Sequence, residues 1–198
     1  MSKLHECEVH RLHPTQITVG MIEVADKRAQ LRELHKDQLR DFLAAHPIPA
    51  VEGPAGKLYI TDHHHLGRAL TEQRIDSGFF LVEADFSHME IEAFWIAMDQ
   101  HKWVHPYDEQ GAQTSFSAIP NHLERLKDDP YRSLAGYVRN AGGYQKTSQP
   151  FIEFLWADFF RKRIVMAAGL DGFYKAVQQG IQLAHSSDAK GLPGFVGP

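Results

Sequence analysis

Two short apolar runs, at residues 48–51 and 57–61, flank a Gly-Pro-Ala-Gly segment at residues 53–56. This arrangement constrains the fold more than any other feature of the chain. Glycine and proline close together favour a tight turn. Leu58 and Ile60 fall on one face of the second run if that run is extended. The pattern predicts a β-hairpin, and because helical patterns lie on both sides of it, the sequence predicts an α+β chain.

Helical periodicity dominates the segments around the hairpin. Leucines recur in residues 25–46 at the spacing of one helix face, and Pro47 stops the pattern, so we predict one long helix there. The residue pattern predicts further helices at residues 64–73 and 90–101 and another strand at residues 79–84. The remaining helices are expected after Pro106, at residues 121–127, 131–140, 151–165 and 170–185.

We therefore predict two parts, an α+β domain with a small mixed sheet over residues 1–104 and a mainly helical extension over residues 105–198 that packs on it. The composition is that of a globular chain, with 43% hydrophobic and 23% charged residues. A net charge of -4 disfavours duplex DNA as the main partner, because DNA binders usually carry a basic surplus.

The single cysteine, Cys7, excludes an intrachain disulfide and is typical of a reducing compartment. The first residues contain no apolar stretch of the kind found in a signal peptide. No apolar run reaches the roughly 18 residues that suggest a membrane span. From these features we expect a cytoplasmic protein without a membrane partner.

Asp62 and the three histidines that follow it, His63, His64 and His65, lie where the predicted hairpin strand gives way to a helix. The start of a helix favours an anion through its backbone N–H groups and its dipole. Histidines there could bind phosphate or transfer protons. Asp62 could cap the helix, orient a histidine or bind a divalent cation. Arg68 could reach a phosphate from the first helical turns.

Two other interpretations compete with this one. The first is a surface loop with a capping aspartate and solvated histidines. A zinc site is less favoured, since adjacent histidines alternate in direction and no other histidine or cysteine stands at a spacing that completes four ligands. A Mg²⁺ or Mn²⁺ ion recruited with a nucleotide fits the motif better.

The chain resembles the superfamily that contains the ParB N-terminal domain, sulfiredoxin and related free-serine kinases. The resemblance covers about the first 85 residues. The chain most resembles the subfamily of ParB-like nucleases, and the resemblance to this subfamily extends further along the chain. The segments that carry it are residues 12–20, 23–27, 46–49, 58–70, 129–136 and 151–161.

In this superfamily, the strand–turn–helix motif holds nucleotide phosphates. Asp62, His64 and His65 match the kinase-like form of the motif, which implies ATP, ADP or CTP together with Mg²⁺ as ligands. His63 replaces the usual glycine, so the turn must accommodate a side chain. Leu66 stands where the superfamily usually has arginine. The motif contains no cysteine, which excludes the chemistry of sulfiredoxin.

The kinase relatives use a glutamate before the first long helix as general base, and Glu23 is the matching residue. Lys27 lies one helical turn later and could contact phosphate. Lys146, in a loop after two glycines, is a further candidate for the ligand site. His105 and Asp108 are minor candidates, because they lie in the segment that joins the two predicted parts.

These features favour an enzyme that binds a small phosphorylated ligand, with a nucleotide as the expected one, and catalyses phosphoryl transfer or phosphodiester hydrolysis at residues 62–65. The alternative is a non-catalytic module that senses a nucleotide or associates with DNA.

Overall fold

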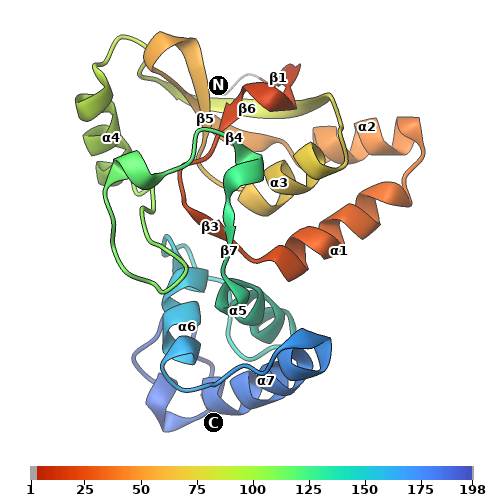
Figure 1. The fold of residues 1–198 in the computed structure, drawn as a ribbon, viewed down its shortest axis with the longest axis vertical. Helices are drawn as coiled ribbons and strands as arrows, with labels where there is room; N and C mark the ends of the chain where they lie inside the picture. The colour runs from red at the N-terminus through yellow and green to blue at the C-terminus, as the bar shows by residue number, and fades with distance from the viewer. Residues whose placement is uncertain (1–3, 198) are drawn as a thin grey trace. The chain divides into compact units, whose positions relative to one another are not determined.

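The computed structural model of the chain describes residues 4–197. It contains two compact units, Met1–Asp128 and Asp129–Pro198 (Figure 1). The division falls after Asp128, later than the expected boundary at residue 104. Residues 105–128 belong to the first unit because their backbone forms hydrogen bonds with the backbone of residues 15–17, which precede the first helix. The N–H of His105 donates to the carbonyl of Thr15 over 2.9 Å, and the N–H of Lys127 donates to the carbonyl of Ile17 over 2.9 Å.

The first unit contains a five-stranded mixed sheet with the strand order β1-β6-β4-β5-β2. Strands β4 and β5 form the predicted antiparallel hairpin around residues 54–56, β1 is antiparallel to β6, and the pairs β4–β6 and β2–β5 are parallel. The α+β fold class is thereby confirmed. The strands of this sheet are β1 (Leu4–Glu8), β2 (Leu12–His13), β4 (Ile48–Gly53), β5 (Lys57–Ile60) and β6 (Ser77–Asp85).

Two predictions in this unit are wrong. The single helix expected at residues 25–46 is divided at residues 33–35, where the backbone N–H of His35 donates to Oε1 of Gln38 over 3.0 Å and starts a second helix. The helix expected at residues 121–127 is a short 3-10 turn followed by a strand, β7 (Lys127–Asp128), which pairs in parallel with β3 (Thr18–Val19). The long helices of the unit are α1 (Met21–Arg32), α2 (Lys36–Ala45), α3 (His64–Glu72) and α4 (Ile91–Gln100), and its 3-10 turns are η1 (Val9–Arg11), η2 (Pro54–Gly56), η3 (Phe116–Ala118) and η4 (Leu123–Arg125).

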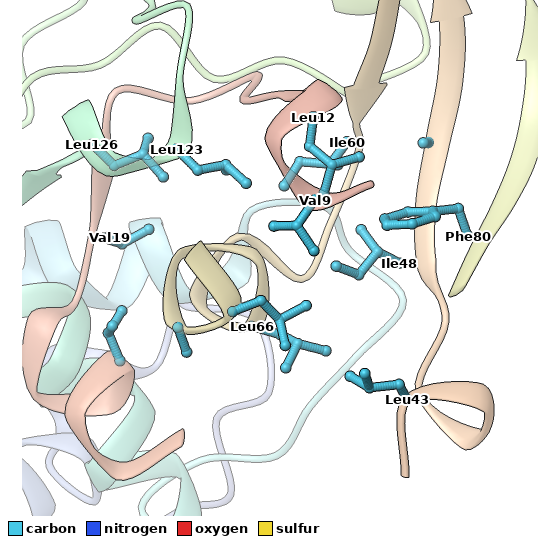
Figure 2. Close-up of a cluster of buried hydrophobic side chains, with 14 of the residues drawn as sticks. Val9, Leu12, Val19, Leu43, Ile48, Ile60, Leu66, Phe80, Leu123 and Leu126 are labelled. Atoms are coloured by element: carbon cyan, nitrogen blue, oxygen red, sulfur yellow. The ribbon is translucent and has the colours of Figure 1, made fainter. Parts of the chain in front are cut away.

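Apolar side chains from the two faces of the sheet enter two separate cores. On one face, Ile60 and Phe80 pack with Leu66 and Leu70 of α3 and with leucines of the η4 segment (Figure 2). On the other face, Tyr59 packs with Phe94 and Met98 of α4. Neighbouring residues of β5 therefore point in opposite directions, as a strand requires. The first core fixes α3, and with it the end of β5 that leads to the histidine motif.

The second unit contains three helices, α5 (Pro130–Asn140), α6 (Ile152–Arg161) and α7 (Gly169–Ala184), and a final 3-10 turn, η5 (Ser187–Ala189). Asp129 caps α5 by accepting from the N–H of Tyr131 over 3.0 Å, as its position before Pro130 predicts. The buried indole of Trp156 stacks on Tyr144 at a centroid distance of 4.2 Å. The aromatic face of α6 is thus a packing surface.

Charged side chains cross-link α5 and α6 within this unit. Asp129 and Asp158 both pair with Arg161. Glu153 pairs with Arg139, and the guanidinium of Arg132 lies 3.4 Å from the ring centroid of Phe154 on α6. Burial raises the pKa of the Asp129 carboxyl, and the nearby Arg161 opposes this shift. Three cations and three carboxylates therefore form a balanced network that holds the two helices together.

Within residues 4–197, no helix is both long enough and apolar enough to cross a membrane.

The ion pair between Asp129 and Arg161 gives a stability prediction. Replacing Arg161 with Ala leaves the carboxylate of Asp129 buried without its main partner, so we expect the free energy of unfolding to fall by about 3 kcal/mol. Lys162→Ala, an exposed change at the next position, should alter it by less than about 0.5 kcal/mol. Denaturant unfolding of the full chain compares the two variants. Equal stabilities for them would contradict a stabilising role of the pair.

Candidate functional site

The histidine motif lies where the sheet gives way to a helix, as expected. Strand β5 ends at Ile60, and His63 is the N-cap of α3. His63 has a φ of 59° and a ψ of 29°, which is the left-handed region. A residue other than glycine adopts this conformation at a cost of about 1 kcal/mol. The backbone N–H of His63 donates to Oδ1 of Asp62 over 2.6 Å. The side chains of Asp62 and His63 are both exposed at this junction.

His64 holds the segment before β3 against the start of α3. Its side chain is buried, and its Nε2 accepts a hydrogen bond of 3.1 Å from the backbone N–H of Thr15. The hydroxyl of Thr15 donates to the carbonyl of Ile60 over 2.7 Å. Because a backbone N–H can only donate, Nε2 of His64 has to be the acceptor, and the ring is neutral with its proton on Nδ1. His64 therefore positions the backbone, whereas the sequence predicted that it would contact phosphate.

His65 makes the second connection between α3 and the first helix. Its Nε2 lies 3.0 Å from the backbone N of Gly20, the N-cap of α1, and 3.4 Å from Oε2 of Glu23 in the first turn of α1. The N–H of Gly20 needs an acceptor at Nε2, whereas the carboxylate of Glu23 needs a donor there. One protonation state of the imidazole cannot satisfy both contacts. The position of a proton on His65 is therefore coupled to the state of Glu23.

Glu23, predicted as a general base, thus lies beside the motif. Its side chain is 20% exposed and that of His65 is 16% exposed, so the pair is shielded on most sides but still open to solvent. Lys27 follows one turn later on α1 and is half-buried. Helices α1 and α3 pack against each other. The structure brings Glu23 and His65 together from distant positions in the sequence.

Arg68 does not point toward the motif. Its Nε donates to Oε1 of Glu72 over 2.7 Å, and its Nη1 donates to the carbonyls of Leu123 and Leu126 over 3.0 and 3.2 Å. Glu72 also pairs with Arg28 of α1 over 2.7 Å. Arg68 therefore fastens the η4 segment to α3. This role differs from the predicted phosphate contact, for which its guanidinium would have to be available.

The remaining candidates have other surroundings. His105 stacks on Tyr107 at a centroid distance of 4.1 Å. Asp108 accepts from the N–H groups of Gln110 and Ala112 over 3.0 and 2.8 Å and so shapes a turn. Lys146 belongs to the second unit, where it is exposed.

Thr15, Gly20 and Asp128 are structural partners of this region that the sequence analysis did not select. Asp128 caps α1 by accepting from the N–H of Met21 over 2.9 Å. None of these three residues stands in a motif that would have indicated its contact. Their partners are distant in the sequence, and only the fold brings them together.

The start of α3 is the end of this helix at which an anion is electrostatically favoured. The first α-helical bond of α3 runs from the N–H of Gly67 to the carbonyl of His63 over 2.9 Å. The helix itself therefore supplies no acceptor for the amides of its first turn, and these amides lie at the positive end of its dipole. The exposed imidazole of His63 stands at the same end.

Among residues 4–197, no group of three or more His, Cys, Asp or Glu side chains is arranged to hold a metal ion. Mg²⁺ that accompanies a nucleotide takes most of its oxygen ligands from phosphate and water and needs only one or two carboxylates. The exposed Asp62 could supply one of them.

A cavity of about 340 Å³ in the first unit does not coincide with the motif. It lies beside the other end of α3, where Thr71 and Arg74 contribute to its lining. The candidate site at residues 62–66 is therefore assigned from two chemical features, the exposed helix start and the neighbouring carboxylate–imidazole pair. A phosphate site at a helix start needs no deep cavity.

Comparison with known proteins agrees with the resemblance seen in the sequence. Residues 5–162 match the family described as "Putative ParB-like nuclease". The crystal structure of protein Atu1540 from Agrobacterium tumefaciens is 41% identical in sequence, matches 100% of this chain and 98% of that chain, and superimposes with a TM-score of 0.93. No curated protein matches the chain. The family match spans well over half of the sequence, and the chain therefore belongs to the family of putative ParB-like nucleases.

Proposed function

We propose that this protein binds the phosphate of a nucleotide at the start of α3 and catalyses phosphoryl transfer or phosphodiester hydrolysis there. The observation that carries the proposal is the placement of the Glu23 carboxylate 3.4 Å from Nε2 of His65, at the helix end that favours an anion. Membership of a nuclease-like family supports a reaction at phosphorus. ATP, ADP and CTP are the first nucleotides to test.

The ligand-binding groups in this proposal are the first amides of α3 and the side chains of His63 and Asp62. The amides and the imidazole of His63 donate hydrogen bonds to phosphate oxygens. Asp62 would supply an oxygen ligand to Mg²⁺, and a bound Mg²⁺ ion would neutralise part of the phosphate charge. Lys27, one turn after Glu23, adds a positive charge on the adjacent helix.

Glu23 is the general base in this proposal. An oxygen of water or of a substrate hydroxyl attacks phosphorus, its proton passes to the Glu23 carboxylate, and the bond to the leaving oxygen breaks. Nε2 of His65 faces Oε2 of Glu23, and a proton on this nitrogen would pair the imidazole with the Glu23 carboxylate in place of its contact with the N–H of Gly20. His64 contributes indirectly as a positioning residue, since it keeps the segment that precedes α1 against α3.

Because His63 has a left-handed conformation, a change to glycine should affect protein stability and nucleotide affinity in opposite directions. His63→Gly removes both the imidazole and the conformational strain, so we expect the Tm to rise by about 2–4 °C while the affinity for ATP–Mg²⁺ falls about tenfold. Ala55→Gly is a matched control, because Ala55 has a φ of 59° in the hairpin turn. It should raise the Tm without changing affinity. Calorimetric titration and thermal unfolding measure both quantities. Unchanged nucleotide affinity in His63→Gly would exclude His63 from the site.

Glu23→Gln tests the proposed base. The change keeps the shape of the side chain but removes its ability to accept a proton, so we expect turnover to fall at least about 100-fold while the Kd for the nucleotide changes less than about threefold. Glu33→Gln, at the C-cap of α1 and exposed, is the control and should keep full turnover. Phosphate release from ATP and hydrolysis of bis(p-nitrophenyl) phosphate are the assays. Equal turnover in Glu23→Gln and the unmodified protein would rule out Glu23 as the base.

A further inference from the structure

The first unit contains a second candidate site, the cavity of about 340 Å³ at the far end of α3. Its volume lies near the lower limit of known small-molecule sites, which begin at about 300 Å³. We propose that it binds a small zwitterion with an apolar body, one carboxylate and one ammonium group, such as an apolar amino acid. This inference is independent of the proposed activity at the start of α3.

The floor of the cavity is apolar. Val9, Leu12 and Leu123 contribute to its lining, and each is at most 3% exposed. Figure 2 shows these three side chains over α3, where they belong to the core between the sheet and this helix. The partly buried Ile75 also lines the cavity and retains apolar surface, and covering that surface with the apolar part of a ligand is favourable.

The rim of the cavity carries both signs of charge. Arg74, Asp76 and Glu124 line it and are exposed. Among residues 4–197, these three side chains have no hydrogen bond or ion pair with another residue. By contrast, Arg68 of the same helix pairs with Glu72 over 2.7 Å. Opposite charges that line one cavity without pairing with each other are complementary to a ligand that carries both signs.

Arg74 occupies a position where glycine is usual. The N–H of Ile75 donates to the carbonyl of Leu70 over 3.0 Å, and the N–H of Arg74 donates to the carbonyl of Thr71 over 3.1 Å. These two hydrogen bonds form the Schellman pattern that ends many helices. Arg74 has a φ of 54° in this pattern. Arg74 therefore has a strained backbone conformation at a position where its side chain lines the cavity. A guanidinium binds a carboxylate with two parallel hydrogen bonds.

Lys102 provides a matched comparison. It follows α4 in the same pattern, with a φ of 59°, and it does not line the cavity. The N–H of Trp103 donates to the carbonyl of Met98 over 2.9 Å, and that of Lys102 donates to Asp99 over 3.0 Å. A change to glycine at either position relieves the same strain. Only the change at Arg74 removes a charge from the cavity.

The test is calorimetric titration of the full chain with valine, leucine and phenylalanine, followed by analogues of the one that binds. We expect at least one of them to bind, and its amide and its N-acetyl derivative to bind at least about tenfold more weakly, because each lacks one of the two charges. Arg74→Gly should weaken binding by a similar factor and raise the Tm. Lys102→Gly should raise the Tm and leave binding unchanged.

Two results would overturn the proposal. One is no heat of binding for any of the three amino acids up to about 10 mM, which would exclude even weak binding. The other is binding that persists at full affinity in Arg74→Gly. Because the titration contains no nucleotide, either result leaves the proposed function of the α3 start open to its own tests.

Discussion

The candidate site depends on two histidine side chains that fasten the segment before α1 to the start of α3. His64 accepts from the N–H of Thr15, and His65 faces the N–H of Gly20. Together with the packing of α1 on α3 and the Arg28–Glu72 ion pair, these contacts hold Glu23 near the start of α3. The histidine motif therefore acts first as a set of tertiary contacts. Of its four side chains, those of Asp62 and His63 are exposed.

This division of roles explains why three adjacent histidines have different surroundings. Successive residues at a helix start point in different directions, so His63 lies outside while the next two side chains turn toward the protein. The inward pair orders the backbone, and the outward residue keeps a strained conformation that glycine would adopt more easily. His65 adds a titratable link, because its Nε2 cannot satisfy Gly20 and Glu23 in the same protonation state.

Local patterns predicted the hairpin, helix α3 and the junction between them, because turn residues and helical periodicity act over short distances. The sequence did not reveal the break at residues 33–35, where neither glycine nor proline interrupts the periodicity. It also missed the pairing of β3 with β7, because such pairings join distant segments. The roles of His64 and Arg68 escaped prediction for the same reason, since their partners are 49 to 58 residues away in the sequence.

The central claim is that a nucleotide phosphate binds at the start of α3, and amide NMR during titration with ATP and Mg²⁺ tests it most directly. We predict that the largest changes in chemical shift occur at the amides of residues 62–66, with a smaller change at Gly20 transmitted through His65. Saturating nucleotide that leaves these amides unchanged, or that perturbs only residues elsewhere in the chain, would contradict the account.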